Sequence, residues 1–470
     1  MVSEKLRATL KKHNQGHLLA FWDELNSQQQ KELLAQIEQL DFDEVDGWIE
    51  RYVKNSNPCP LPQHFDPAPY YPAITDSGNQ EKYKKAIEHG QTLLSEGKVA
   101  AFVVAGGQGT RLGFDGPKGN FPISPVKNKT LFTLFAEMIA AASKKYGTAL
   151  PWYIMTSPLN HRETIDTFKS SNYFGLDKKN IFIFQQGTMP NFGIDGRILM
   201  ADKGNLAVSP DGHGGSLKAL YKSGATNDMK RRGVKIISYF QVDNPLINIF
   251  DPLFIGLHAL DKAEMSSKAL IKAGPLEKVG NFCLVDGKVT VIEYSDLPDE
   301  LANKRNADGS LVFQLGSIAI HIISRKFVEK LNAKGFALPF HRAVKKIPHI
   351  DQSGKLVEPS QPNGIKLETF VFDALPLASK SIILETIRSE EFGPVKNAGG
   401  ADSAETARQM ITDRAAAWLE YAGVKVPRKP DGSVDAIIEI FPTFALDKEE
   451  LKAKAEQIKP IKAGEKVYLG

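Results

Sequence analysis

Short, almost continuous apolar runs alternate with helical patterns through the middle of the chain. Four of these runs are rich in β-branched and aromatic residues: VAAFVVA (99–105), WYIMTS (152–157), IFIFQQ (181–186) and KIISYFQVD (235–243). Such runs are typical of strands that are buried on both faces of a parallel sheet. Helical patterns separate them, near residues 130–145, 160–170 and 215–231. The alternation predicts an α/β fold with an open, mostly parallel sheet.

The N-terminal region follows a different pattern. Residues 1–50 repeat apolar positions at the helical spacing i, i+3, i+4, i+7. The Pro-rich stretch 57–74 cannot be a regular helix, so it predicts a linker, and a helix is expected at about 80–96.

After the fourth apolar run the pattern changes again. Between about 280 and 325 the apolar runs are paired, and Asp286-Gly287 predicts a hairpin turn. Beyond residue 390 we expect a helix at 403–423, then the apolar run AIIEIFPTFAL and a charged helix. The patterns therefore predict three domains: a helical N-terminal region with its linker (1–96), a central α/β domain (97–385) and a small C-terminal domain (386–470).

Composition narrows the possible functions. The 470 residues are 42% hydrophobic and 24% charged, which excludes a disordered chain and a disulfide-knit scaffold. The net charge of +4 is too small for a general nucleic-acid binder. Cys59 and Cys283 lie far apart in the sequence, which fits a reducing compartment and predicts no zinc site. No signal peptide or membrane-length apolar stretch is visible, so we expect a soluble cytoplasmic protein without a membrane partner.

A glycine-rich loop follows the first apolar run. The segment VVAGGQGTRLGFDGPKGNFPI (103–123) combines glycines, which let backbone N–H groups approach phosphate oxygens, with the cations Arg111 and Lys118. It is not a P-loop, because no Gly-Lys-Ser/Thr ends it, and Leu112 stands where a dinucleotide fingerprint needs its third glycine. A turn with surface charges is the alternative, but the spacing favours phosphate binding.

Asp243 ends the fourth apolar run, just past the buried strand expected at 236–240. Ligands of open α/β sheets bind outside the carboxyl ends of the strands, and Mg²⁺ in such sites takes one or two carboxylates and leaves its other positions to water and phosphate. Asp243 is therefore a candidate Mg²⁺ ligand, and the alternative is a cap of the turn before Pro245.

The run AGGQGTRLG followed by PKG resembles the signature of the eukaryotic-type UDP-sugar pyrophosphorylases, nucleotidyltransferases that join UTP to a sugar 1-phosphate. Further segments resemble the family in the same order, and they are most similar to its N-acetylhexosamine branch: GHLLAFWDEL (16–25), SPDGHGG (209–215), RRGVKIISYFQVDN (231–244), DPLFIG (251–256), VIEYSD (291–296), PNGIKLETFVFD (362–373) and EEFGPVKNA (390–398). The resemblance implies a Rossmann-like sheet of the GT-A-like nucleotidyltransferase type, a uridylyltransferase activity, Mg²⁺ as cofactor, and UTP and a sugar 1-phosphate as partners.

The resemblance also implies roles for individual residues. Four positions match catalytic residues of the family: Arg111, Lys118, Asp243 (also the metal ligand) and Lys396. Seven match contacts to the nucleotide: Gly106, Gly107, Gly109, Thr110, Gln186, Gly212 and His213. Five are expected near the sugar: Asn244, Glu293, Gly316, Ser317 and Lys366.

Two positions depart from the N-acetylhexosamine branch. His213 and Ser317 stand where those enzymes carry Asn. We expect N-acetylglucosamine 1-phosphate as the substrate, with a glucose-type or broad-specificity pyrophosphorylase as the alternative. A non-catalytic nucleotide-sugar sensor is a candidate of another class, whereas the glycine spacing disfavours a nicotinamide dehydrogenase. The oligomeric state stays open.

Overall fold

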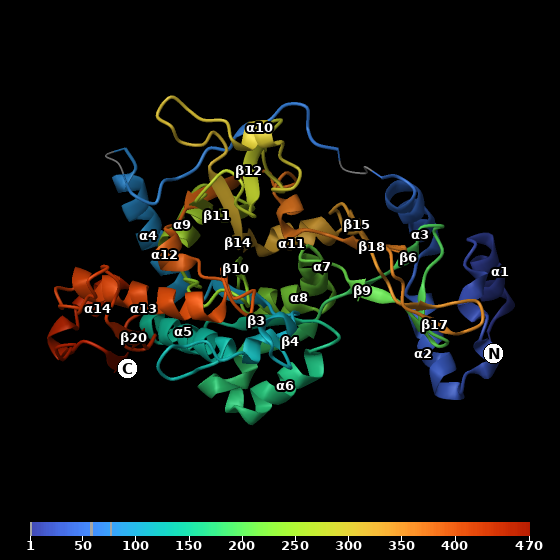
Figure 1. Cartoon of the computed structure of the whole chain (residues 1–470), viewed down its shortest axis with the longest axis horizontal. Helices are drawn as coiled ribbons and strands as arrows, with labels where there is room; N and C mark the ends of the chain where they lie inside the picture. Colours follow the sequence, from blue (N-terminus) through green and yellow to red (C-terminus); the bar gives the residue numbers. More distant parts are fainter. Residues whose placement is uncertain (1, 57–59, 76–77) are drawn as a thin grey trace. The chain divides into compact units, whose positions relative to one another are not determined.

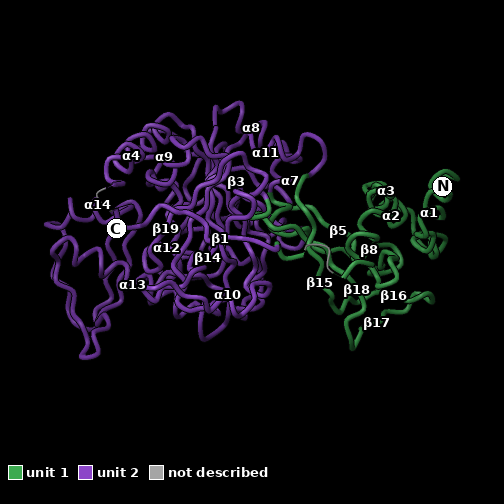
Figure 2. Tube along the Cα trace, turned by 90° about the horizontal axis from the view of Figure 1, so that it is seen from above, with its two compact units in different colours: residues 1–62, 186–216, 337–373 green, residues 63–185, 217–336, 374–470 purple. Residues whose placement is uncertain are grey.

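The computed structural model describes residues 2–56, 60–75 and 78–470, so Cys59 lies outside the described residues. The chain divides into two compact units, each assembled from segments that are distant in the sequence (Figure 2). Unit 1 comprises residues 1–62, 186–216 and 337–373, and unit 2 comprises residues 63–185, 217–336 and 374–470. The division into domains 1–96, 97–385 and 386–470 stays a prediction.

A ten-stranded sheet forms the centre of unit 2. Its parallel part consists of the four predicted apolar runs in the order β10-β2-β3-β4: β2 (Val99–Val104), β3 (Trp152–Thr156), β4 (Ile181–Gln185) and β10 (Ile236–Gln241). Every residue of β2 and β3 is buried, because helices or other layers cover both faces. The predicted α/β class with an open parallel sheet is confirmed.

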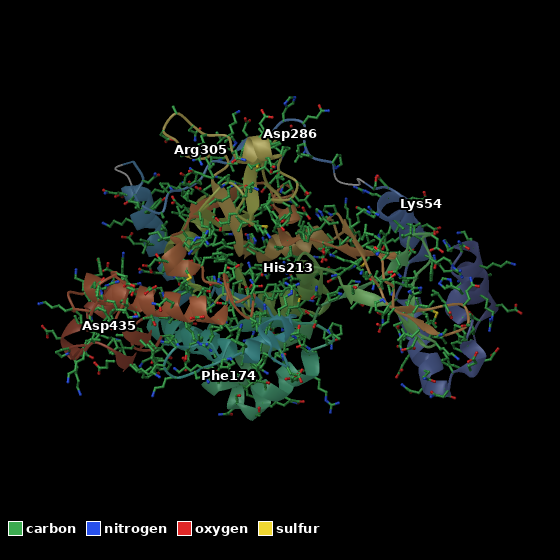
Figure 3. All side chains as sticks on the ribbon, viewed as in Figure 1. Lys54, Phe174, His213, Asp286, Arg305 and Asp435 are labelled. Carbon is green, nitrogen blue, oxygen red and sulfur yellow. The ribbon has the colours of Figure 1, made fainter. Side chains whose placement is uncertain are left out.

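The remaining strands of this sheet join it mainly by antiparallel pairing. They are β1 (Asp66–Pro67), β11 (Met265–Ile271), β12 (Gly280–Val285), β13 (Lys288–Ile292), β14 (Leu315–Ser324) and β19 (Ser381–Glu385), of which β19 alone pairs in parallel, with β11. β14 lies antiparallel to β10 and connects the two parts. Asp286 and Gly287 both have positive φ at the tip of the β12–β13 hairpin, as predicted (Figure 3).

Helices cover the sheet. Four of them pack in one core cluster with β2, β10 and β14: α4 (Gln80–Ser95), α5 (Leu131–Tyr146), α6 (His161–Ser170) and α9 (Pro252–Leu260). Figure 1 shows α4 and α9 side by side. The helix expected at 215–231 is two helices, α7 (Gly215–Lys222) and α8 (Ala225–Arg231), because Gly224 between them adopts φ +82°. The shorter helices are α10 (Asp299–Ala302), α11 (Arg325–Asn332) and α12 (Arg388–Glu391).

The C-terminal segment of unit 2 has its own small core (Figure 1). It contains α13 (Ala404–Tyr421), β20 (Ala436–Ile440), α14 (Lys448–Lys452) and β21 (Glu465–Leu469), with β20 and β21 in parallel. Leu419, Ile438 and Leu451 are completely buried there. The predicted helix, apolar strand and charged helix are therefore present.

Unit 1 packs the N-terminal helices against short strands. The helices are α1 (Glu4–Lys12), α2 (Ser27–Glu38) and α3 (Phe42–Trp48). The strands are β5 (Thr188–Pro190), β6 (Phe192–Gly193), β7 (Met200–Asp202), β8 (Asn205–Leu206), β9 (Val208–Pro210), β15 (His341–Lys345), β16 (His349–Ile350), β17 (Leu356–Val357) and β18 (Gly364–Glu368). Leu33 and Ile37 of α2 share a buried cluster with Phe192 and Leu367. Within the described residues, no helix combines the length and the apolar character needed to cross a membrane.

Candidate active site

The glycine-rich loop of unit 2 folds back on itself after β2. The Gly109 N–H donates to the Gly116 carbonyl at 2.9 Å, and the Lys118 N–H donates to the Gly107 carbonyl at 3.0 Å. The Asn160 carboxamide donates from the start of α6 to the carbonyls of Ala105 (2.9 Å) and Gly107 (3.2 Å). These bonds place Lys118 beside the turn that the glycines form, although eleven positions separate Gly107 from Lys118.

The glycines of this loop serve different purposes. A Cβ on Gly107 would meet no atom within 4 Å, so packing inside the protein does not require glycine there. A Cβ on Gly109 would lie 2.6 Å from the Phe114 ring, and one on Gly119 would lie 2.1 Å from the Phe132 ring. Gly107 is therefore the position at which a ligand can approach the backbone. Gly106 precedes it, and Thr110 is exposed at the start of a short 3₁₀ turn, Thr110–Leu112.

The four predicted catalytic residues lie within electrostatic range of one another. Burial lowers the pKa of the Lys118 ammonium, the Asp243 carboxylate raises it, and the Arg111 and Lys396 cations lower it, with a net lowering. The Lys118 ammonium also donates to the Val395 carbonyl at 3.3 Å. Three cations and one carboxylate, drawn from three loops, therefore converge in unit 2.

Asp243 and Lys396 lie on two loops that are bonded to each other. The Val395 N–H donates to the Asp243 carbonyl at 2.8 Å. The Asn244 carboxamide, only 4% exposed, donates to the Glu391 carbonyl at 2.7 Å and accepts from the Gly393 N–H at 3.1 Å. These bonds join the two loops, and the expected sugar contact of Asn244 stays a prediction. The Lys396 ammonium lies 3.7 Å from the Asp402 carboxylate.

The donor set near Asp243 fits a weakly held divalent ion. The described residues contain no group of three or more His, Cys, Asp or Glu side chains arranged to enclose a metal. A single half-buried carboxylate at the end of β10 matches Mg²⁺, whose other positions are filled by water and substrate phosphates. Asp243 is the predicted residue that would hold it.

Two of the expected sugar residues of unit 2, Glu293 and Ser317, lie beside Gly280. Gly280 pairs with Ser317 across β12 and β14, and a Cβ on Gly280 would lie 3.5 Å from the Glu293 carboxylate and 3.8 Å from the Ser317 Cβ. Gly316 lies next to Ser317, and a Cβ there would point instead toward Val279 and Leu270. Sequence reasoning did not select Gly280, because a strand-end glycine carries no chemical signal of its own.

The expected nucleotide residues of unit 1 form a second cluster. The Gln186 carboxamide donates to the Asp211 carboxylate at 3.0 Å and to the Gly212 carbonyl at 2.8 Å. Gly212 has φ +84°, and a Cβ there would lie 2.3 Å from the Thr369 carbonyl, so only glycine fits.

Thr369 anchors the loop that carries Gly212. It donates its N–H to the Asp211 carbonyl (2.9 Å) and accepts the Gly214 N–H (2.8 Å). His213 is exposed on this loop (Figure 3). Lys366 lies on β18, also in unit 1, with its ammonium 3.4 Å from the Glu368 carboxylate. Asp211 and Thr369 were absent from the sequence-based set, although both lie within motifs that the resemblance had marked.

Comparison with known proteins identifies the family of the chain. The model of a family described as UTP–glucose-1-phosphate uridylyltransferase matches residues 71–414. The chain is 37% identical to UDP-N-acetylhexosamine pyrophosphorylase-like protein 1 of Homo sapiens, covering 96% of this chain and 95% of that protein. It is also 37% identical to UDP-N-acetylglucosamine pyrophosphorylase of Saccharomyces cerevisiae, covering 88% of this chain and 90% of that protein.

A solved structure shows the same similarity in three dimensions. The UDP-N-acetylglucosamine pyrophosphorylase of Trypanosoma brucei superimposes with a TM-score of 0.80 at 26% identity, covering 100% of this chain and 99% of that one. The predicted resemblance is thereby confirmed: the chain belongs to the UDP-sugar pyrophosphorylase family of uridylyltransferases.

Proposed function

We propose that this chain joins UTP to N-acetylglucosamine 1-phosphate and releases UDP-N-acetylglucosamine and pyrophosphate. The observation that carries the proposal is the convergence of Asp243, Arg111 and Lys396 around Lys118, beside a glycine loop that is open at Gly107. Both substrates are anions, so a site of this kind needs several cations and a carboxylate that can hold a metal ion. The names of the relatives support the choice of sugar.

The reaction is a nucleotidyl transfer between two phosphates. An oxygen of the sugar phosphate attacks the α-phosphorus of UTP, a P–O bond forms, and the bond to the β-phosphate breaks with pyrophosphate as the leaving group. The attacking phosphate already carries nearly two negative charges, since its second pKa is near 6. No general base is needed, and catalysis consists of alignment and charge stabilisation.

The cations of unit 2 take the phosphate roles. Arg111, Lys118 and the backbone N–H groups around Gly107 bind the triphosphate, and Gly106, Gly109 and Thr110 shape that loop. Lys396 neutralises the sugar phosphate. The family points to a divalent metal requirement, and we propose Mg²⁺ held by Asp243, where it neutralises phosphate charge when bound.

Unit 1 supplies the base-recognition residues. Gln186 and the backbone of Gly212 contact the uracil in this proposal, and the exposed His213 lies on the same loop. Thr369 supports them by holding the loop in its conformation. Lys366 remains a candidate for a phosphate or sugar contact.

The sugar is read by Glu293 and Ser317. The Glu293 carboxylate accepts hydrogen bonds from sugar hydroxyls, and it lies beside Gly280 and Ser317. Ser317 favours a second candidate, a glucose-type or broad UDP-sugar pyrophosphorylase, because its short hydroxyl replaces the amide found in the N-acetylhexosamine branch.

One assay tests the proposal. Pyrophosphate release is measured from UTP and Mg²⁺ with the 1-phosphates of N-acetylglucosamine, N-acetylgalactosamine, glucose and galactose in parallel. We expect the highest kcat/KM with N-acetylglucosamine 1-phosphate and no release from Asp243→Asn. A preference for glucose 1-phosphate would select the second candidate. Binding of UTP without release with any of the four sugars would select the nucleotide-sugar sensor.

We also propose a cytoplasmic location, which subcellular fractionation tests. Cys283 supports it, because this thiol forms no disulfide in the described structure, which fits a reducing compartment.

A further inference from the structure

We propose that Lys268 is a positioning residue for the transfer: it aligns the loop that carries Asp243 with the loop that carries Lys396. The inference rests on the catalytic roles proposed above for those two residues. Lys268 itself lies on β11 and touches neither of them through any contact described here.

The ammonium of Lys268 bridges the two loops. It lies 2.6 Å from the Asp251 carboxylate, at the end of the loop that begins with Asp243. It also lies 2.5 Å and 2.6 Å from the two oxygens of Glu391, five positions before Lys396. Only 1% of Lys268 is exposed, so the two carboxylates take the place of water around its charge. Burial lowers the pKa of Lys268, but Asp251 and Glu391 raise it by more, so the ammonium is charged at neutral pH. Burial raises the pKa of the Glu391 carboxyl, and the Lys268 ammonium opposes this by lowering it.

Two further side chains connect the same loops. Asn244 donates to the Glu391 carbonyl, as described above. The Arg414 guanidinium, from α13, donates to the carbonyls of Leu246 (2.8 Å) and Glu390 (2.9 Å). Of these three side chains, Lys268 is the one that belongs to a strand of the rigid central sheet. Its ion pairs therefore fix the positions of both loops relative to β11.

A cavity makes these polar links important. It has a volume of about 450 Å³, and its walls include Lys268, Asp251, Glu391, Arg414 and Ile247. Where a cavity adjoins the loops, close packing does not hold them in place from that side. Their separation therefore depends on the ion pairs and hydrogen bonds that cross between them.

Stability alone does not account for Lys268. Burying an ammonium with two carboxylates costs desolvation that the ion pairs only partly offset, and an apolar group of similar size often serves stability equally well. A buried charge network does fix the relative position of the segments it joins, because its charges tolerate few other arrangements. The loops that carry Asp243 and Lys396 are irregular, and they require such a fixed relative position.

The test replaces Lys268 with an uncharged side chain of similar length. In Lys268→Met, both loops lose the ion pairs that hold them to β11. We expect kcat to fall about 10-fold or more, since small misplacements of reacting groups slow the chemical step strongly. The Mg²⁺ concentration for half-maximal activity and the KM for the sugar 1-phosphate should each rise about fivefold, because Asp243 and Lys396 shift apart. Lys82→Met is the control: it breaks a 2.8 Å lysine–aspartate ion pair with Asp261, at the opposite end of α9 from Asp251.

The readouts separate positioning from general destabilisation. All variants are assayed well below their melting temperatures, and Lys82→Met should keep the wild-type Mg²⁺ and sugar-phosphate constants. Glu391→Gln retains an acceptor for Lys268, so it should fold and show the same shifts at a smaller size, about twofold. If Lys268→Met folds and its Mg²⁺ and sugar-phosphate constants are unchanged, the proposal is overturned. If Lys268→Met does not fold, unchanged Mg²⁺ and sugar-phosphate constants in Glu391→Gln overturn it instead. Asp243→Asn is run in parallel: full activity there would refute the catalytic assignment itself, independently of Lys268.

Discussion

The backbone N–H of Val395 donates a 2.8 Å hydrogen bond to the carbonyl of Asp243. The carbonyl of the same Val395 accepts the Lys118 ammonium at 3.3 Å. One residue thus connects the carboxylate loop, the lysine of the glycine-rich segment and, as the neighbour of Lys396, the third cationic loop. Displacing any of these loops disturbs the other two, which is why the predictions below measure binding and turnover separately.

Removing a phosphate-binding cation should abolish most of the turnover. We expect Lys118→Met and Arg111→Ala each to lower kcat/KM about 10²–10³-fold, because stabilisation of developing charge is lost in a site where water does not replace it. Lys84→Met, an exposed lysine on α4, is the control and should remain at the wild-type rate. Initial rates of pyrophosphate release check this prediction, and near-normal activity of either variant would remove that residue from the site.

The two classes of glycine in the loop should respond oppositely to an added methyl group. Gly107→Ala should keep wild-type stability but weaken UTP binding at least 10-fold, because its Cβ projects into open space where the ligand would lie. Gly119→Ala should instead lower the free energy of unfolding by about 1–3 kcal/mol through overlap with Phe132. Urea unfolding and UTP titration measure the two effects. Gly274→Ala, also at an open position, should change neither.

Affinity for UTP should fall at alkaline pH. The pKa of Lys118 lies below its ordinary 10.5, so its charge is present at neutral pH and disappears as the pH rises through that lowered value. Asp243 raises this pKa, so Asp243→Asn should move the alkaline limb of UTP binding to lower pH. The measurement is the Kd for UTP between pH 7 and 10 without metal. If the Kd for UTP rises at the same pH in the wild type and in Asp243→Asn, this would contradict the electrostatic coupling of Lys118 with Asp243.

Acid should destabilise the central sheet through two buried histidines. Burial lowers the pKa of His258 and of His321 to about 3, against 6.5 for a free side chain. The unfolded chain therefore binds more protons between pH 6.5 and 3, and stability is present above pH 6.5 and falls as the pH drops through that window. Each histidine should cost about 2 kcal/mol between pH 7 and 5.

The contribution of one histidine can be isolated by substitution. His321→Gln removes a titrating group but can keep a hydrogen bond to Ser267, which lies 2.9 Å from the ring in the wild type. The loss of unfolding free energy between pH 7 and 5 should be smaller in the variant by about 2 kcal/mol. Equal losses in both proteins would show that His321 titrates with the same pKa in the folded and unfolded states, which contradicts the lowered pKa.

The residue at position 317 should tune the choice of sugar. Ser317→Asn introduces an amide beside Gly280 and Glu293, and the extra hydrogen bond to an acetamido group is worth about 1 kcal/mol. We expect the ratio of kcat/KM for N-acetylglucosamine 1-phosphate over glucose 1-phosphate to rise about fivefold. Gly316→Ala is a poor control, because its Cβ would meet Val279 at 2.7 Å, so Ser317→Ala serves instead and should not raise the ratio.

Local patterns along the chain were sufficient for much of the fold. The four parallel strands appear where β-branched and aromatic runs predicted them. β2, β3 and β10 are buried at almost every position, as expected for strands covered on both faces, whereas β4 lies at the edge of the sheet and is only partly buried. The hairpin at Asp286-Gly287 follows from the positive φ that both residues accept. The break at Gly224 was missed, because one glycine within a helical pattern does not by itself decide whether the helix continues.

Part of the candidate site, like part of the fold, could be predicted from the sequence. The family, the glycine loop with Arg111 and Lys118, and the carboxylate just past β10 can be predicted from the chain alone, because residue types at short spacing carry that chemistry. The folded structure is needed to show that Val395 joins Asp243 to Lys118, that the Asn244 carboxamide joins two loops, and that Lys268 bridges Asp251 and Glu391. These contacts connect residues more than a hundred positions apart, or depend on burial, and neither property is written in a local pattern: distant segments meet only when the sheet and its core assemble.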